Sequence, residues 1–584
     1  MKKLINEPAD VVNEMCAGLV LAHPELELDP AYRVVKKREI NPKKVTLISG
    51  GGSGHEPAHA GFIGRGMLDA AVCGDVFASP SQIQVYHAIR ETASDAGTLL
   101  IVKNYSGDIM NFKNAAYLAQ EDGITVDYVK VDDDIAVTDS LYTVGRRGVA
   151  GTVFVHKIAG AAAERGANLP EVKAVAEKVV AHVKSIGFAL TSCTVPANGA
   201  PTFEIGEGEM EYGVGIHGEP GIRREALANS AELASRMVEA IAGELALGEG
   251  SRVAVLVNGF GATPLMELYL YHGDAMRELS ARGVTVARSF VGNYMTSIDM
   301  AGASLSILSL DDELEELLNE PSFAPAFRVD GPVAEATFPA APPVYDDEDA
   351  NFGIETPGVC ARVEGSITLD NVIYMVDAMC ESAIRNEGPF CELDSHAGDG
   401  DFGASIAKGF RQLKRQWKHI GEAGEHSIAS FLDACSLVIM EHCGGASGPI
   451  WGSAFRAAAR SAQGKGALSV ADFAMLLQAA VAGIQTTGER SFGRGAQVGD
   501  KTLIDALVPC ADAWTEAAEQ GLGFKEAFAA GAEAAMAGAK STEQITARMG
   551  RAGTVGERSL GYADAGAYGL AVIFADVKDA LTFA

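Results

Sequence analysis

The stretch Val45-Thr-Leu-Ile-Ser-Gly-Gly-Gly-Ser-Gly-His-Glu-Pro57 joins an apolar run of strand length to a run of glycines. Glycines directly after a buried strand let backbone N–H groups approach a small polar ligand closely. In open α/β sheets, ligands bind at such carboxyl ends of strands. The nucleotide-binding spacing Gly-x-Gly-x-x-Gly fails because Glu56 and Pro57 intervene. The stretch therefore predicts an α/β domain with a small-molecule site at this strand end.

Further strand-length apolar runs alternate with helical patterns through the first 330 residues. We expect strands at 98–102, 126–131, 253–257 and 284–288, and helices at 111–120, 169–186 and 264–282. Apolar strands alternating with helices are typical of a largely parallel sheet that is covered on both faces. The segment 169–186 can also connect two α/β lobes. We predict an α/β domain of two lobes over residues 1–330.

The composition changes near residues 331–357, which are rich in proline, alanine and acidic residues and lack periodicity. Such a segment is typical of an extended linker. Beyond it, strand signals are nearly absent and alanine-rich segments of helix length recur. We expect helices around 370–386, 428–442, 453–462, 469–485, 502–520 and 566–581. Residues 358–584 are therefore predicted to form an all-α domain, a helical barrel or bundle.

Two more polar motifs in the first domain lie where strands or turns end. Lys103-Asn-Tyr-Ser-Gly-Asp108 follows the strand at 98–102, and Gly213-Val-Gly-Ile-His217-Gly-Glu-Pro-Gly surrounds a histidine with glycines. If the strands are neighbours, Lys103 and Asp108 share a crevice with His55, and Asp108 and His55 can act as acid and base. An open imidazole at His217 can act as a nucleophile. The alternatives are a surface histidine at 55 and an ordinary turn residue at 217.

Three carboxylates, Asp394, Asp399 and Asp401, stand within eight residues, with Gly398, Gly400 and Gly403 among them. Glycines at this density break a helix, so the carboxylates cluster on a turn rather than on a solvated helix face. Close anions repel one another unless a cation neutralises them, and oxygen ligands suit a hard ion such as Mg²⁺. An acidic loop that binds nothing is the alternative.

Three other glycine-bearing connections in the helical domain accompany the aspartates. They are Cys443–Pro449, Gly499–Asp505 and Arg551–Gly566. Ser447 at a helix start can present its hydroxyl and backbone N–H groups to phosphate. Arg551, Arg558 or Lys501 can offset nucleotide charge. Together with the carboxylates, these connections predict a nucleotide–magnesium site at one end of the helices.

The bulk composition excludes several classes of function. The formal net charge is −30, from 47 basic and 77 acidic residues, so nucleic acid and anionic membranes are unfavourable partners. The sequence offers no signal core and no apolar run of membrane-spanning length. Nine scattered cysteines without a Cys-x-x-Cys pair indicate reduced thiols. We expect a soluble, cytoplasmic protein of two to four domains.

In combination these motifs resemble the single-chain, ATP-dependent dihydroxyacetone kinases over nearly the whole length. The motifs are Gly50–Pro57, Lys103–Asp108, Gly215–Gly221, Gly398–Asp401, Gly499–Thr502 and Gly556–Gly561, in the family's order. The resemblance implies a ketose-binding domain, a linker and a helical ATP domain. It implies that His217 adds to the substrate carbonyl to give a hemiaminal, which selects short ketoses and aldehydes over glycerol, with His55 and Asp108 as acid–base residues.

The resemblance also implies the ligand contacts. Gly52, Ser53, Gly54 and Lys103 correspond to substrate contacts, and Asp394, Asp399 and Asp401 correspond to ligands of two Mg²⁺ ions that bridge the phosphates of ATP. The nucleotide pocket of the family corresponds to Phe402, Gly403, Ala404, Ser405, Ala446, Ser447, Leu503, Arg551, Asp564, Ala565 and Gly566. Phe402 and the sequence Asp564-Ala-Gly depart from the usual residues, which affects the adenine site rather than the reaction. The family further implies a homodimer.

The leading hypothesis is ATP-dependent phosphorylation of dihydroxyacetone and of glyceraldehyde. A kinase for another ketose such as erythrulose is the nearest alternative, and an added FAD-cyclising activity on the helical domain is another. A non-catalytic ketose sensor belongs to a different class. The presence of His55, Asp108, His217 and the three aspartates disfavours a sensor, because a binding module has no use for a magnesium cluster.

Overall fold

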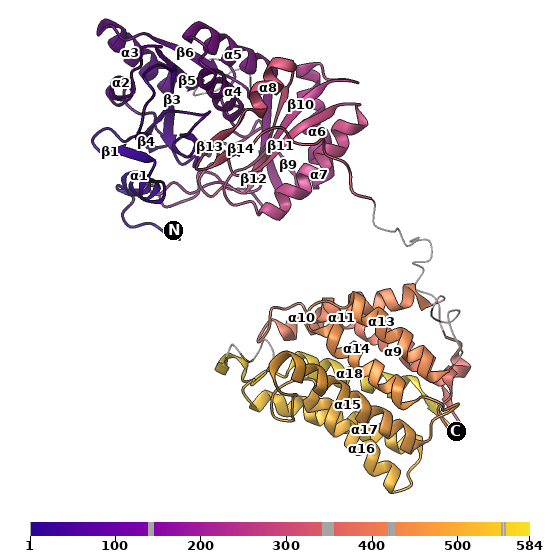
Figure 1. The fold of residues 1–584 in the computed structure, drawn as a ribbon. Helices are drawn as coiled ribbons and strands as arrows, with labels where there is room; N and C mark the ends of the chain where they lie inside the picture. Colours follow the sequence, from indigo (N-terminus) through magenta and orange to yellow (C-terminus); the bar gives the residue numbers. More distant parts are fainter. Residues whose placement is uncertain are drawn as a thin grey trace. The chain divides into compact units, whose positions relative to one another are not determined.

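A computed structural model of the chain describes residues 2–137, 145–340, 356–417, 420, 427–549, 553 and 556–584. The chain divides into two compact units, Met1–Pro339 and Ala340–Ala584. The first, coloured indigo to magenta in Figure 1, contains strands and helices, and the second, orange to yellow, is almost entirely helical. The expected α/β plus all-α fold class is thus confirmed.

The first sheet of the α/β unit has the strand order β1-β2-β4-β3-β5-β6. Its strands are β1 Leu26–Asp29, β2 Val34–Lys37, β3 Thr46–Ser53, β4 Ala70–Val76, β5 Thr98–Lys103 and β6 Val126–Val131. The four strands β4-β3-β5-β6 run parallel, and β1 and β2 add an antiparallel edge. The carboxyl-terminal ends of the neighbouring strands β3 and β5 therefore lie at the same end of the sheet.

Successive side chains of the central strands point to opposite faces of the sheet and pack into two different hydrophobic cores. Ile48, Leu100 and Val102 pack against α2 and α3, whereas Leu47, Leu99 and Ile101 pack with α4 and α5 on the other face. These helices are α2 Gln82–Glu91, α3 Ser106–Glu121, α4 Thr152–Glu164 and α5 Leu169–His182. Because helices cover both faces, the strands need continuous apolar runs, which is the pattern seen in the sequence.

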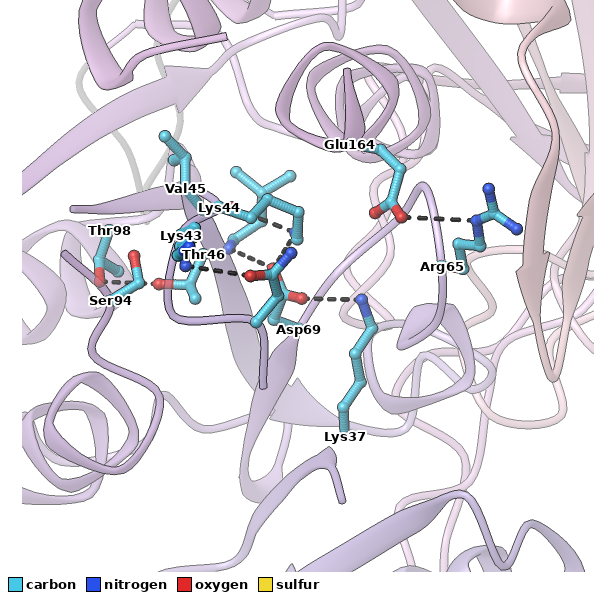
Figure 2. A network of polar contacts seen from close by, with 12 residues as sticks. Lys37, Lys43, Lys44, Val45, Thr46, Arg65, Asp69, Ser94, Thr98 and Glu164 are labelled. Carbon is cyan, nitrogen blue, oxygen red and sulfur yellow. Dashed lines mark hydrogen bonds and ion pairs between the residues drawn. The ribbon is translucent and has the colours of Figure 1, made fainter. Parts of the chain in front are cut away.

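A polar cluster lies at the opposite end of this sheet, where the parallel strands β3 and β4 begin (Figure 2). Asp69, just before β4, is almost fully buried; Lys37 Nζ lies 2.7 Å from its Oδ1 and Lys44 Nζ 2.8 Å from its Oδ2. Burial alone would raise the pKa of Asp69, but the two ammonium groups reverse this and hold the pKa below its ordinary value. The cluster therefore links β2, β3 and β4 at the end of the sheet that is opposite the glycine run.

The second sheet of this unit has the order β11-β10-β12-β7-β8-β9 and is mostly antiparallel, with only β10 and β11 parallel. The prediction of largely parallel sheets therefore holds for the first lobe and is wrong in this detail for the second. Its strands are β7 Val183–Ala189, β8 Glu209–Tyr212, β9 Arg223–Ala226, β10 Arg252–Gly259, β11 Thr285–Gly292 and β12 Gly302–Ser309.

The helices α6 Ser230–Leu245 and α7 Leu265–Ala281 pack on one face of this second sheet. The remaining elements of the unit are α1 Val11–Ala22, α8 Asp312–Asn319, β13 Ser322–Ala324, β14 Phe327–Val329 and a 3₁₀ turn at Ala60–Phe62. One helix expectation needs correction, because α5 ends at His182 and residues 183–189 form β7. No glycine or proline separates the two elements, so the sequence gives no sign of the change.

The helical unit surrounds one apolar core to which all of its long helices contribute. Its helices are α9 Leu369–Arg385, α10 Glu387–Asp394, α11 Phe402–Arg415, α13 Ile428–His442, α14 Ser447–Ser461, α15 Val470–Phe492, α16 Ile504–Glu519, α17 Phe524–Ser541 and α18 Ala565–Ala580. Short 3₁₀ turns occupy Gly358–Ala361, Thr542–Gln544 and Gly556–Ser559, and β15 Arg362–Val363 pairs with β16 Thr582–Phe583. The sequence did not predict α10, α11 or α17 as separate helices.

Within the described residues, one helical segment, Val470–Ser491 of α15, is long and apolar enough to cross a membrane by length and composition alone. Leu476, Leu477, Val481 and Ile484 of this helix belong to the core of the helical unit. A core helix meets the same criteria, so the segment is weak support for a membrane span.

Candidate active site

The glycine run belongs to β3 itself, which continues to Ser53 rather than ending at Ser49. A Cβ atom on Gly50 would lie 2.4 Å from the carbonyl oxygen of Val72, and one on Gly52 would lie 2.6 Å from the amide nitrogen of Ala78. Glycine is therefore required here because neighbouring backbone approaches closely. The end of β3 is held in a narrow gap, with His55 just beyond it.

His55 is fully buried and has a defined tautomer. Its Nδ1 lies 2.8 Å from the carbonyl oxygen of Thr296, and its Nε2 lies 3.2 Å from Nε2 of His217. Because a carbonyl only accepts, Nδ1 carries the proton and Nε2 is an acceptor when the ring is neutral. Burial, followed by the positive charges of Lys103 and of a protonated His217, holds the pKa of His55 well below its ordinary value. His55 is thus a neutral base directed at His217.

His217 lies half-buried among aromatic rings. The ring of Tyr105 packs at 4.4 Å and that of Phe77 at 5.4 Å, both edge-to-face, and Phe77 also stacks on His55 at 5.2 Å. Burial, then Lys103 and Arg147, keeps the pKa of His217 well below its ordinary value. The imidazole is therefore neutral and can act as a nucleophile.

Lys103, the last residue of β5, and Asp108, in the first turn of α3, lie together beside Gly51. A Cβ on Gly51 would lie 3.4 Å from Oδ2 of Asp108 and 3.5 Å from Nζ of Lys103. Both side chains are buried, and the Lys103 ammonium has no hydrogen-bond partner among the residues that the structure describes. Burial lowers the pKa of Lys103 and raises that of Asp108, although each is partly offset by the other's charge. A buried ammonium without a hydrogen-bond partner leaves its donors available to a ligand.

Two other predicted substrate contacts, Ser53 and Gly54, have hydrogen-bond partners within the protein. Ser53 Oγ donates to the carbonyl of Gly74 at 2.8 Å, and the amide of Gly54 donates to the carboxylate of Glu56 at 3.0 Å. Sequence reasoning assigned no role to Phe77 or Thr296. Thr296 is 241 positions from His55 and carries no motif, so no sequence signal could have placed it there.

In the helical unit, the predicted carboxylates converge on the connection between α10 and α11. Asp394 ends α10, and Asp401 precedes α11. One carboxylate oxygen from each of Asp394, Asp399 and Asp401 lies within 4.8 Å of the other two. Oδ2 of Asp394 also accepts the amides of Gly400 and Asp401 at 2.9 and 3.1 Å. A Cβ on Gly398 would lie 2.3 Å from the carboxylate oxygen Oδ1 of Asp394, so a side chain at 398 would displace this carboxylate.

This oxygen-only cluster fits Mg²⁺, which prefers carboxylate ligands and phosphate oxygens. The three carboxylates open onto a cavity of about 190 Å³. Eight of the predicted nucleotide-pocket residues line it: Phe402, Ser405, Ala446, Ser447, Leu503, Asp564, Ala565 and Gly566. Ser447 is the first residue of α14, as expected for a phosphate-facing helix start.

Two predicted nucleotide-pocket residues that the structure describes, Gly403 and Ala404, do not line this cavity. A Cβ atom on Gly403 would lie 2.1 Å from the carbonyl oxygen of Glu387. Glycine at this position therefore allows α11 to pack closely against α10. Ala404 donates its amide to Cys391 Sγ at 3.2 Å, and neither residue lines the cavity. Arg551 lies outside the described residues.

Lys501, a candidate for offsetting nucleotide charge, lines the cavity, and its ammonium also binds backbone carbonyls. Its Nζ donates to the carbonyls of Thr542, Ile545, Ser559 and Tyr562, at 2.5 to 3.2 Å. Four carbonyls exceed the three protons of an ammonium, so they share its donors. Lys501 therefore fixes the segment that leads to Asp564. Asp564 caps α18 through the amide of Ala567, and burial raises the pKa of Asp564 to about 7.

Two models of known protein families match the chain, one in the α/β unit and one in the helical unit. Residues 17–326 match the Dak1 domain and residues 396–579 match the DAK2 domain. The chain belongs to the dihydroxyacetone kinase family. The resemblance predicted from the motifs is thus confirmed.

Several relatives within the dihydroxyacetone kinase family are similar over long stretches. The L-erythrulose 1-kinase of Mycolicibacterium smegmatis is 36% identical, with 100% of both chains covered. The triokinase/FMN cyclase of Homo sapiens is 34% identical, with 99% of both covered. The dihydroxyacetone-binding subunit DhaK of a PTS-dependent dihydroxyacetone kinase from Listeria innocua is 56% identical, covering 54% of this chain and 95% of the relative.

Among solved structures, the dihydroxyacetone kinase of C. freundii in complex with AMP-PNP and Mg²⁺ matches with a TM-score of 0.61. It is 32% identical to this chain, and 99% of each chain is covered. A relative thus combines both units in one chain and binds an ATP analogue with Mg²⁺. For the present chain, these comparisons establish a dihydroxyacetone kinase family member but leave the preferred ketose to be assigned.

Proposed function

We propose that this protein transfers the γ-phosphoryl group of ATP to a terminal hydroxyl of dihydroxyacetone, and also of glyceraldehyde, while His217 holds the substrate as a hemiaminal. The observation that carries the proposal is the direct approach of His55 Nε2 to His217 Nε2 at 3.2 Å, beside the unpaired ammonium of Lys103. A neutral nucleophile that faces a neutral base is the arrangement that carbonyl addition requires.

In the proposed addition, His55 Nε2 takes the proton from His217 Nε2, whose lone pair then forms a bond to the carbonyl carbon of the ketose. The C=O π bond breaks, and the carbonyl oxygen takes the proton from His55, so the product is a neutral hemiaminal. Glycerol has no carbonyl and cannot be captured in this way. Lys103 donates to a substrate oxygen in this step.

Asp108 is the proposed base for the terminal hydroxyl. Its carboxylate lies next to Lys103, beside Gly51. Burial raises the pKa of Asp108, which makes its carboxylate a stronger base. The hydroxyl proton passes to Asp108 as its oxygen bonds to the γ-phosphorus and the bond to the β-phosphate breaks. We propose two Mg²⁺ ions on Asp394, Asp399 and Asp401, which when bound neutralise phosphate charge during transfer.

The rest of the cavity is proposed to hold the nucleotide through Phe402, Gly403, Ala404, Ser405, Ala446, Ser447, Leu503, Arg551, Asp564, Ala565 and Gly566. Residues 1–330 are the proposed ketose domain, 331–357 the linker and 358–584 the ATP domain. The family resemblance supports a homodimer, and we place the protein in the cytoplasm as part of this proposal.

Phosphorylation of a four-carbon ketose is a second candidate, because the whole-length M. smegmatis relative is named an L-erythrulose 1-kinase. The human relative is named a triokinase/FMN cyclase, so the FAD-cyclising alternative is also tested. The geometry favours neither over dihydroxyacetone.

The deciding experiment measures ADP release with Mg-ATP and dihydroxyacetone, glyceraldehyde, erythrulose or glycerol, using wild type and His217→Ala. We expect turnover only with carbonyl substrates, fastest with dihydroxyacetone and weakened in the variant. Turnover with glycerol, or none with any carbonyl sugar, contradicts the proposal. Faster turnover with erythrulose supports the second candidate, and manganese-dependent release of riboflavin cyclic phosphate from FAD supports the cyclase.

A further inference from the structure

The loop that carries His217 is attached to a buried chain of charged groups. Glu219 Oε2 accepts the backbone amide of His217 at 2.8 Å, and its Oε1 accepts from a terminal nitrogen of Arg147 at 3.0 Å. The side chain of Arg147 is 3% exposed and also donates to Asp134 at 2.7 Å and to the carbonyl of Gly213 at 3.0 Å. Arg147 therefore contacts both the start of the loop and the carboxylate next to His217.

The loop sequence makes room for this ion pair. A Cβ on Gly215 would lie 1.8 Å from Oε1 of Glu219 and 2.7 Å from a terminal nitrogen of Arg147. Gly213 and Gly218 have φ values of +75° and +68°, a conformation that glycine adopts without strain. The loop thus turns tightly around a carboxylate and a guanidinium, and any side chain at 215 would displace them.

We propose that Glu219 and Arg147 are positioning residues, which fix the backbone of His217 so that its imidazole meets His55 and the substrate carbonyl. This inference rests on the proposed function of His217. Neither residue needs to touch the substrate. Glu219 is the direct link, because it is the group that binds the His217 amide. Arg147 joins Glu219, Asp134 and the Gly213 carbonyl through three different guanidinium nitrogens, an arrangement that a lysine cannot reproduce.

The aromatic rings and Glu219 act on different parts of His217. Tyr105 and Phe77 contact its imidazole, whereas Glu219 binds its backbone amide. Loss of the Glu219 carboxylate therefore acts on the position of His217 rather than on the nucleotide site, which belongs to the other unit.

The test compares Glu219→Ala, Glu219→Gln and Gly215→Ala in the full-length protein. A matched control is Glu225→Ala, which removes a carboxylate of the same lobe that pairs with Arg223 and Arg236 rather than with Arg147 or the His217 amide. Adduct formation is followed by NMR with dihydroxyacetone labelled with ¹³C at the carbonyl, which moves from the carbonyl to the tetrahedral-carbon region. The steady-state KM for ketose, the KM for ATP and kcat are measured in parallel.

We expect Glu219→Ala to raise the KM for ketose about tenfold or more, the loss typical of a hydrogen bond to a charged group, and to reduce the adduct fraction. The KM for ATP should stay within about twofold of wild type, because the lost bond lies in the other unit. Glu219→Gln should recover part of the adduct, since its amide oxygen can still accept the His217 amide. Gly215→Ala should resemble Glu219→Ala.

An unchanged ketose KM and adduct fraction in Glu219→Gln and Glu219→Ala would overturn the inference, as would an equal effect of Glu225→Ala. If Glu219→Ala fails to fold, the isosteric Glu219→Gln and Gly215→Ala still decide. Failure of wild type to form any adduct would instead contradict the proposed function, so the two outcomes are distinguishable.

Discussion

Histidines 59 and 156 form a second buried imidazole pair, outside the proposed chemistry. Nδ1 of His59 lies 3.0 Å from Nε2 of His156, and each ring has another nitrogen without a partner among the described residues. Burial, with a smaller contribution from Lys103, lowers the pKa of His156 to about 3. Folding therefore requires His156 to stay neutral at pH values where an unfolded histidine is protonated.

His156 should make the α/β unit acid-sensitive. Since its folded pKa lies below the unfolded value of about 6.5, its stabilising effect is complete above pH 6.5 and decreases as pH falls toward 3. In His156→Gln, the free energy of unfolding should depend on pH less steeply between pH 6 and 4, by about 1.4 kcal/mol per pH unit. Urea unfolding by circular dichroism measures this slope. The exposed His182→Gln is the control, and an equal slope in wild type and His156→Gln contradicts the assignment.

One ammonium group binds both ends of the connection between α17 and α18. Lys501 is 1% exposed, has a φ of +62°, and donates to carbonyls at both ends of the segment 542–562. Thr542 of this segment also accepts the amide of Asp564 through Oγ1 at 2.8 Å. The element that delivers Asp564 to the cavity is therefore held from the start of α16.

Lys501→Met should release this segment and leave carbonyls without a donor. We expect a loss of roughly 3–5 kcal/mol of unfolding free energy in the helical unit, together with a higher KM for ATP. All three tryptophans, Trp417, Trp451 and Trp514, lie in this unit, so tryptophan fluorescence during urea unfolding reports on it selectively. The exposed Lys525→Met on α17 is the matched control. If Lys501→Met behaves like that control, the segment does not depend on the ammonium.

At the scale of the whole molecule, the proposed reaction is divided between two units with separate cores. The buried clusters of the α/β unit contain residues 12–329, and that of the helical unit contains residues 363–581. The proposed carbonyl chemistry lies in the first unit, and the carboxylates and their cavity lie in the second. Units with complete cores can fold independently.

We therefore expect fragments 1–339 and 340–584 to retain separate halves of the activity. Fragment 1–339 should form the ketose adduct without nucleotide, and fragment 340–584 should bind ATP only with Mg²⁺. Carbonyl ¹³C NMR and titration calorimetry measure these two properties. Chelation with EDTA, or Asp399→Asn in the second fragment, should reduce ATP binding tenfold or more without affecting the adduct. Phosphorylation by either fragment alone would contradict this division.

The sequence by itself determined the chemical groups and most of the local structure. Apolar runs and helical periodicity predicted strands such as β3, β5 and β6, because these signals depend on residues close together in the chain. The grouping of Asp394, Asp399 and Asp401 followed from the glycines between them. Only the tertiary structure showed that His55 lies against His217, 162 positions away, that Thr296 fixes its tautomer, and that the Lys501 ammonium binds backbone carbonyls. The direction of a side chain and its distant partners depend on how whole elements pack, and periodicity carries no information about that packing.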